Sequence, residues 1–308
     1  MAAHHHSLHA HDGDARDHQI APDASTLRAL AAALALTAGY ALVEALGGWL
    51  AGSLALLSDA GHMATDAAAL GLALFAQWVA RRPPSPRASY GYARAEVLAA
   101  FVNALALLLL VGFIVIEAVR RITTPAPVAG GTVLGIATVG LLVNLVTAWM
   151  LSRASSSTVS RSALLHVMSD ALGSIAAIVA GAVILATGWT PIDPLLSLLT
   201  AVLILRATWR LLAQTTGVLM EGVPAHLDYQ AIGNALSGIA GVTGVHDLHV
   251  WTLVPGKDMA TAHVTCCGDS AQVLEDARAV LAARGLEHAT VQVEPPEGAG
   301  DCEKQAHR

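Results

Sequence analysis

The sequence predicts an α-helical membrane protein with six transmembrane helices and a C-terminal α+β cytosolic domain of ferredoxin-like type. Three observations lead to this prediction. Of the 308 residues, 55% are hydrophobic and 13% are charged, whereas soluble domains carry about 25% charged residues. The apolar residues are grouped into six runs, each long enough to cross a bilayer. After the sixth run, the pattern changes to short helical and strand-like segments.

The six expected spans are separated by clusters of proline, glycine or serine, which mark the connecting loops. They cover 28–51, 53–80, 95–119, 131–151, 163–187 and a sixth run that begins after Pro191 and Pro194 and ends near Gln214. We therefore expect a transmembrane domain over residues 27–216.

The arginines predict the orientation, because cytoplasmic loops of membrane proteins are enriched in Lys and Arg. If the spans alternate, one side receives Arg81, Arg82, Arg87, Arg94, Arg153, Arg161 and Arg210. The other side receives only Arg120 and Arg121. The first side is expected to be cytoplasmic, and an even number of spans then places both termini there.

Polar tails are expected at both ends, over residues 1–26 and 297–308. The N-terminal tail holds six of the 14 histidines and no apolar run of the kind found in signal peptides. It is either a solvated, disordered tail or a loose metal-gathering one, since neutral imidazole binds Zn²⁺. The net charge is −6, and the absence of a basic patch argues against nucleic-acid binding.

Residues 217–296 are expected to form the cytosolic domain. Leu227, Ile232, Leu236 and Ile239 recur at helical spacing, and 242–253 and 259–267 have the composition of strands joined by a turn at Pro255-Gly256. A helix is expected from Ser270, as its capping residue, to about Arg284, and a last strand over 288–294. This order of elements is typical of a small open-faced sandwich.

The main candidate site lies inside the expected spans. His62 and Asp66 are four residues apart on the second span, as are His166 and Asp170 on the fifth. Residues four apart share a helix face, and two imidazoles with two carboxylates form a tetrahedral set suited to Zn²⁺. An ionised aspartate in mid-span costs about 2.5–3.5 kcal/mol. Two matched pairs therefore favour a metal transport site over the alternative, two His–Asp hydrogen bonds between helices.

These ligands predict a mechanism, because metal binding requires neutral histidine and ionised aspartate and thus competes with protons. We expect a Zn²⁺/proton antiporter that exports metal from the cytoplasm by alternating access. Two alternatives belong to other classes: an intramembrane zinc metalloenzyme and a metal sensor without flux. A catalytic zinc usually keeps three protein ligands and an open position, and no dedicated output domain is visible, so we expect neither an enzyme nor a sensor.

Further polar residues lie within the spans. Glu44 and Asn144 are near mid-span and are the preferred candidates for lining the ion path. For these residues, and for Asp59, Asn103 and Asp193, the alternative is a hydrogen bond between helices, a helix cap or an interfacial position.

Segments 53–66, 90–96, 166–170 and 248–251 resemble the cation diffusion facilitator family. The resemblance extends over residues 27–296. It implies a homodimer, six spans, a cytosolic ferredoxin-like domain and export of divalent metal against proton entry. The His-Asp pairs resemble the zinc branch, with Cd²⁺, Co²⁺ and Ni²⁺ left as other possible cargoes. The loop between the fourth and fifth spans is rich in serine rather than histidine, which favours a bacterial inner-membrane protein over a eukaryotic vesicular one.

The resemblance also implies a second metal site in the cytosolic domain. His246, His263 and Glu294 resemble family ligands, and Cys302 resembles a C-terminal cysteine ligand of vertebrate-type members. A histidine of the N-terminal tail could add another ligand. Because side chains alternate along a strand, His246 is expected to face away from His249, which we expect to pack with Trp251. The alternative is a set of ordinary surface residues near a sheet.

Overall fold

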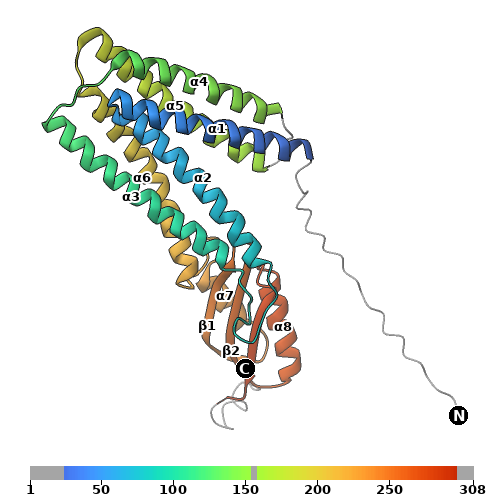
Figure 1. The fold of residues 1–308 in the computed structure, drawn as a ribbon. Coiled ribbons are helices and arrows are strands. Elements are labelled where there is room, and N and C mark those ends of the chain that lie inside the picture. The colour runs from blue at the N-terminus through green and yellow to red at the C-terminus, as the bar shows by residue number, and fades with distance from the viewer. Residues whose placement is uncertain (1–23, 154–157, 297–308) are drawn as a thin grey trace.

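A bundle of six long helices is joined at one end to a small α/β domain in the computed structural model (Figure 1). It describes residues 24–153 and 158–296, with only the backbone described for 24–30, 153, 158–163, Leu165, His166 and Ser169. The helices are α1 (Ala24–Ala51), α2 (Leu54–Ala80), α3 (Ala95–Thr123), α4 (Gly130–Arg153), α5 (Thr158–Thr187) and α6 (Ile192–Leu219). Each contains a stretch long and apolar enough to cross a membrane, so the six predicted spans are confirmed.

The start of α6 differs from the prediction. Pro194 was expected to precede this helix, but it lies in the first turn, two residues after Ile192. Proline is tolerated there because the first N–H groups of a helix have no intrahelical acceptor. The helix also continues beyond Gln214 to Leu219, so it reaches almost to the α/β domain.

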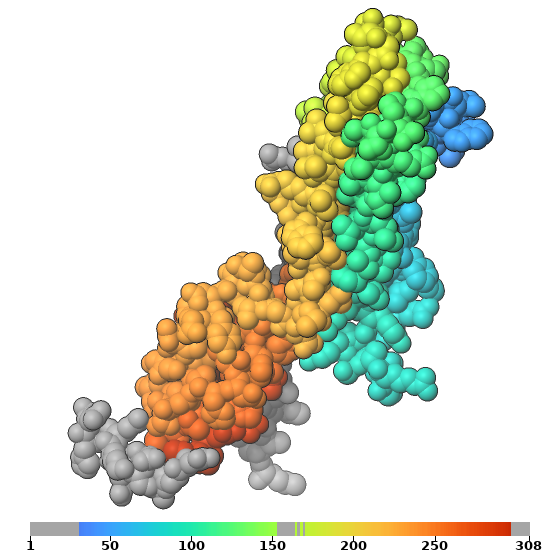
Figure 2. Space-filling model, turned by 90° about the vertical axis from the view of Figure 1, so that its left-hand side faces the viewer, coloured from blue at the N-terminus to red at the C-terminus, as the bar shows by residue number. Residues whose placement is uncertain are grey.

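The six helices form two groups that meet at one end. α1, α4 and α5 run together, α3 and α6 run together, and α2 lies between the groups (Figure 1). Figure 2 shows α3 and α6 side by side along one face of the bundle, leading down to the α/β domain. The groups converge at the end away from that domain, which we call the distal end, and diverge toward it (Figure 1).

Large apolar side chains cover the outside of the bundle. Examples with more than half of their surface exposed are Leu50 and Trp49 on α1, Leu109 and Ile116 on α3, and Trp209 on α6. Water would disfavour so much exposed apolar surface, whereas lipid tails solvate it. Most residues buried between the helices are apolar too, but they include the polar or acidic side chains of Glu44, Asn144, Asp170 and Asp193.

The α/β domain is a two-layer sandwich. Its elements are α7 (Tyr229–Ser237), β1 (Val242–Val254), β2 (Lys257–Cys266), α8 (Ser270–Ala282) and β3 (His288–Glu294). The sheet order is β1-β2-β3, with β1 antiparallel and β3 parallel to β2. One face packs on α7 and α8 through a core that includes Ile232, Leu248, Ala262 and Leu281. The predicted order of elements is confirmed.

The cap of α8 is a correction. Ser270 was expected to cap this helix, but Asp269 is the N-cap, and its carboxylate accepts hydrogen bonds from the N–H groups of Ala271 and Gln272. Asp and Ser are both good N-cap residues. The helix therefore starts one residue earlier than expected, with Ser270 as its first helical residue.

An ion pair fastens the bundle to the segment that leads into the α/β domain. Nη2 of Arg94, at the start of α3, lies 2.9 Å from Oε1 of Glu221, just after α6. Glu221 has a φ of 56°, a left-handed conformation that is uncommon for residues other than glycine. The chain therefore turns sharply after α6, and Arg94 holds the turn.

Candidate metal centres

The two predicted ligands on α2 lie one above the other on the same helix face. Nε2 of His62 is 3.5 Å from Oδ2 of Asp66, and 21% and 25% of these side chains are exposed. This geometry follows from the helix, which brings residues i and i+4 together. The pair can therefore present a nitrogen and an oxygen ligand to one ion.

Of the two predicted ligands on α5, only Asp170 has a described side chain. Asp170 is buried, with 3% of its surface exposed. The backbone of His166 lies in α5, one turn before Asp170, but its side chain lies outside the described residues.

The packing of α2 against α5 determines which of the four predicted ligands lie at the same height along the bundle. A Cβ added to Gly173 would lie 2.9 Å from Oδ1 of Asp59, so these residues are in contact. The helices are antiparallel, since α2 begins and α5 ends at the distal end (Figure 1). Three residues forward along α2 are then matched by three back along α5. This register brings His62 to the level of Asp170, and Asp66 to the level of His166 one turn further on.

The beginning of α2 is held by α6. The carboxylate of Asp193, which is fully buried, accepts hydrogen bonds from Oγ of Ser53 at 2.5 Å and from the N–H of Leu54 at 2.6 Å. Ser53 is itself the N-cap residue of α2. Asp193 was considered as either a path residue or a cap, and its contacts are those of a cap.

Glu44 and Asn144, the candidates for the ion path, are both buried between helices, with exposed fractions of 0% and 2%. Nδ2 of Asn144 donates a hydrogen bond to Oγ of Ser174 on α5 at 3.2 Å. Glu44 accepts no hydrogen bond from any described residue. The two side chains thus differ, since Asn144 links two helices and Glu44 has no such contact.

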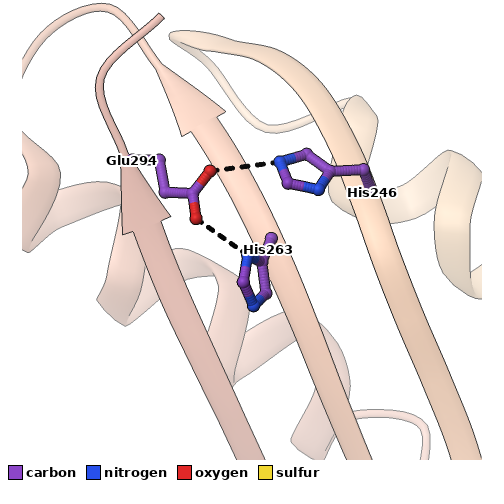
Figure 3. A group of neighbouring side chains, drawn as sticks. All are labelled: His246, His263 and Glu294. Atoms are coloured by element: carbon purple, nitrogen blue, oxygen red, sulfur yellow. Dashed lines mark hydrogen bonds and ion pairs between the residues drawn. The ribbon is translucent and has the colours of Figure 1, made fainter.

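A second cluster of ligands lies on the sheet of the α/β domain, as Figure 3 shows. Nε2 of His246 on β1 is 3.1 Å from Oε2 of Glu294, and Nδ1 of His263 on β2 is 2.8 Å from Oε1 of the same carboxylate. One ligand atom from each residue lies within 4.8 Å of the others. Two imidazole nitrogens and a carboxylate oxygen are ligands that Zn²⁺ accepts, so the cluster has a suitable donor set for that ion.

A β-bulge changes the faces of β1 and makes one prediction wrong. His246 pairs with His263, but His249 pairs with Thr261, so two residues of β1 lie opposite one residue of β2. Because Leu248 belongs to the core on the other face, His246 and His249 both lie on the open face. The expectation that they face opposite sides assumed regular alternation, and the extra residue removes it.

The bulge places Asp247 beside the histidines. Asp247 has a φ of 53°, and its Oδ1 lies 2.9 Å from Nε2 of His249. Its Oδ2 lies 3.8 Å from Nε2 of His263. His249 therefore contacts Asp247, and the sequence analysis missed Asp247 altogether. The spacing of three between His246 and His249, rather than an even number, was compatible with a bulge but did not require one.

The carboxylates of this cluster are biased toward the ionised form. The hydrogen bond from His249 lowers the pKa of Asp247 below its usual range, and the nearby imidazoles act in the same direction. Partial removal from water acts to raise the pKa of Glu294, but the hydrogen bonds from His263 and His246 outweigh it, so this pKa is lowered too. Both carboxylates are thus available as ligands at neutral pH. Cys302 and the N-terminal histidines lie outside the described residues.

Sequence comparison agrees with this architecture. Residues 30–220 match the family model described as "Cation efflux transmembrane domain". Residues 224–296 match the one described as "Cation efflux protein, cytoplasmic domain". The chain therefore belongs to the cation efflux family, a family of membrane transporters rather than enzymes. Its α/β domain is the cytoplasmic domain, and the distal end of the bundle is at the opposite side of the membrane.

Several relatives are similar over most of their length. The protein called Zinc transporter ZitB from Escherichia coli is 45% identical over 279 residues, which cover 89% of each chain. The Cadmium, cobalt and zinc/H(+)-K(+) antiporter of Bacillus subtilis is 38% identical, with 83% of this chain and 85% of the relative covered. The Metal cation efflux system protein CzcD of Cupriavidus metallidurans is also 38% identical, over 87% of this chain and 86% of the relative.

Proposed function

We propose that this protein exports Zn²⁺ from the cytoplasm of a bacterium across the inner membrane in exchange for protons. The transport site in this proposal consists of His62, Asp66, His166 and Asp170. The register of α2 and α5 is the observation that carries it, because it brings the two His-Asp pairs to the same two levels of the bundle. The names of the similar proteins, which mention zinc and protons, support the same cargo and coupling.

The ligand chemistry accounts for the exchange. Zn²⁺ binds neutral imidazole and ionised carboxylate, so a site that releases its metal can take up protons in its place. Two aspartates balance the charge of the ion, which lowers the cost of holding it in an apolar bundle. Imidazole nitrogens favour Zn²⁺ over Mn²⁺ and Mg²⁺, whereas Cd²⁺, Co²⁺ and Ni²⁺ also accept them.

The exposure of the site favours loading from the cytoplasmic side. The side chains of Asp66 and His62 are 25% and 21% exposed, whereas Asp170 is 3% exposed and Glu44 is fully buried. The helices also diverge toward the cytoplasmic domain and converge at the distal end (Figure 1). We infer that this arrangement is the inward-open one, with the path closed beyond Asp170.

The cytoplasmic domain is proposed to bind a regulatory metal ion and to dimerise. His246, His263 and Glu294 would hold the ion, with Cys302 and a histidine of the N-terminal tail as further ligands. Three described ligands leave a tetrahedral ion one ligand short, and either of these two residues would fill that position. Because this is the cytoplasmic domain, an ion held there would follow the metal concentration of the cytoplasm.

Transport in liposomes tests the main proposal. The purified protein is reconstituted with a zinc-sensitive dye inside, and zinc uptake is followed under an imposed pH gradient. Asp66→Ala is expected to abolish uptake, because it removes a charged ligand. Glu96→Gln is the matched control, since it removes one carboxylate from the exposed start of α3. Normal flux in Asp66→Ala would refute the proposed site.

A further inference from the structure

Glu44 is a buried carboxylate to which no described residue donates a hydrogen bond. It is fully buried on α1, in the distal half of the bundle. Neither of its two oxygens accepts a hydrogen bond from a residue that the structure describes. A carboxylate is stable in such surroundings only with a proton or a cation beside it.

Asp193 is a second buried carboxylate in the bundle, and its role is structural. It too is fully buried, but a serine hydroxyl and backbone N–H groups at the start of α2 donate to both of its oxygens. The hydrogen bonds of Asp193 compensate for its burial, whereas Glu44 has no hydrogen bond from a described residue to do so. Glu44 is therefore placed for a ligand rather than for holding helices together.

The charged groups nearest to Glu44 are carboxylates, which bind metal ions through oxygen. Gly48 of α1 packs against Leu56 of α2, so in these antiparallel helices Glu44 lies at the level of Asp59. The charges of Asp59 and of Asp170 on α5 both act on Glu44. The hydroxyl of Tyr40, one turn before Glu44, donates to the carbonyl of Ile136 rather than to Glu44.

There is also space beside Asp59. This side chain lines a cavity of about 20 Å³ between α2, α5 and α6, together with Ser58, Gly173 and Thr200 and without a residue of α1. A cavity of this size holds about one water molecule. The missing side chain of Gly173 makes room for the carboxylate, because a Cβ there would lie 2.9 Å from its Oδ1. An ion arriving at Asp59 could thus keep one water ligand.

We propose that Glu44, Asp59 and Asp170 form an oxygen-only binding station through which the exported divalent cation leaves. This inference rests on the proposed function. The station lies on the distal side of His62, because Asp59 and Gly173 are one turn closer to that end than His62 and Asp170. Asp170 belongs to both sites and can pass the ion from one to the other.

The outer station would hold Zn²⁺ less tightly than the inner site, because the two sites offer different ligand atoms. The proposed inner site offers two imidazole nitrogens, which bind Zn²⁺ well, whereas the outer station offers only oxygens. An ion that moves outward exchanges nitrogen for oxygen ligands, so Zn²⁺ is held less tightly before release. Net export needs such weakening, because an ion held tightly at the exit would leave slowly.

Glu44→Gln tests the station, since it keeps the size of the side chain and removes its charge. Zinc uptake into liposomes driven by a pH gradient is expected to fall by about tenfold or more. Zinc binding to the purified variant, measured by equilibrium dialysis, is expected to stay close to that of the wild type, because the inner ligands are untouched. Asp59→Asn should behave in the same way, and Glu96→Gln, the control, should change neither quantity.

Zinc-for-zinc exchange separates the roles of metal and proton. Radioactive zinc inside the liposomes is exchanged for unlabelled zinc outside at equal pH, so no net proton movement is needed. The station predicts that Glu44→Gln slows this exchange as strongly as net uptake. Normal exchange with impaired uptake would show that Glu44 carries only protons, and would overturn the proposal.

Two other results would also overturn it. Normal uptake in Glu44→Gln would show that the metal does not need this carboxylate. Loss of zinc binding together with uptake would make Glu44 a part of the inner site or of the fold. A wild-type protein without any zinc flux would refute the proposed function itself, a result distinct from a loss confined to the variants.

Discussion

The transmembrane and cytoplasmic ligand clusters are built in opposite ways. In the bundle, each pair of proposed ligands is one helical turn apart on one helix, within an apolar protein–lipid environment. On the sheet, the three ligands come from three strands and remain accessible, with 52% of the His246 side chain and 31% of the His263 side chain exposed. The first arrangement makes charged ligands costly without an ion, whereas the second leaves them solvated. Loss of the ion should therefore affect the two clusters very differently.

The largest effect is expected from Asp170→Asn. This change removes a buried charged ligand of the proposed transport site, so zinc uptake should fall by about a hundredfold or more. Zinc binding by the cytoplasmic cluster should persist, which equilibrium dialysis of the full-length variant would detect. If Asp170→Asn transported zinc at the wild-type rate, the two clusters could not differ in the way described.

His263→Ala is the matching change in the cytoplasmic domain. His263 contacts Glu294 through Nδ1, and its loss should weaken zinc binding there by about 10- to 100-fold. The transmembrane ligands are unaffected, so uptake measured at saturating zinc should fall much less than in Asp170→Asn. His226→Ala serves as the control, because His226 is an exposed histidine of the same domain outside the cluster. Equal weakening in both variants would contradict a site at His263.

Asp193→Ala tests the support of α2 rather than its ligands. The change leaves Oγ of Ser53 and the N–H of Leu54 without the acceptor that they share in the wild type. Loss of a buried acceptor costs about 1–3 kcal/mol, so the thermal unfolding temperature of the detergent-solubilised protein should decrease. Asp228→Ala, which removes the exposed cap of α7, should cost less. An unchanged unfolding temperature in Asp193→Ala would show that the cap is not important for stability.

The smallest effect is a pH dependence of the cytoplasmic domain. The pKa of Glu294 is lowered in the folded chain by His263 and His246. A carboxylate with a lowered pKa stabilises the fold above its unfolded value, and this contribution is lost as the pH falls through the folded value. Glu294→Gln should therefore lower the unfolding temperature at about pH 7 and have little effect near about pH 3. A difference that grows as the pH falls would contradict this assignment.

The helical part of the molecule could be predicted well because its signals are local. An apolar run of membrane length identifies a span, and a spacing of four residues places His62 and Asp66 on one face. Neither inference needs knowledge of a neighbouring helix. The errors were confined to helix ends, where Pro194 and Asp269 each fit more than one position.

The sheet was harder to predict, because its site depends on pairing between strands. Alternation along β1 assigns His246 and His249 to opposite faces, and only the pairing with β2 reveals the bulge at Asp247. Likewise, nothing in the sequence indicates that Asp193 contacts Ser53, which is 140 residues away in the chain. Contacts of this kind depend on tertiary packing, which local sequence patterns do not encode.

The hydrogen bonds between Asp193 and the start of α2 have a mechanical consequence. α6 has 28 residues, which corresponds to a rod of about 42 Å. One end of this rod holds the first turn of the helix that carries His62 and Asp66, and the other leads to the turn held by Arg94 and Glu221. A rotation of the cytoplasmic domain that turns α6 would therefore also move the first turn of α2, because Asp193 joins the two helices there. Through α6, a movement in the cytoplasm reaches the distal end of the bundle, beside the proposed exit for the ion.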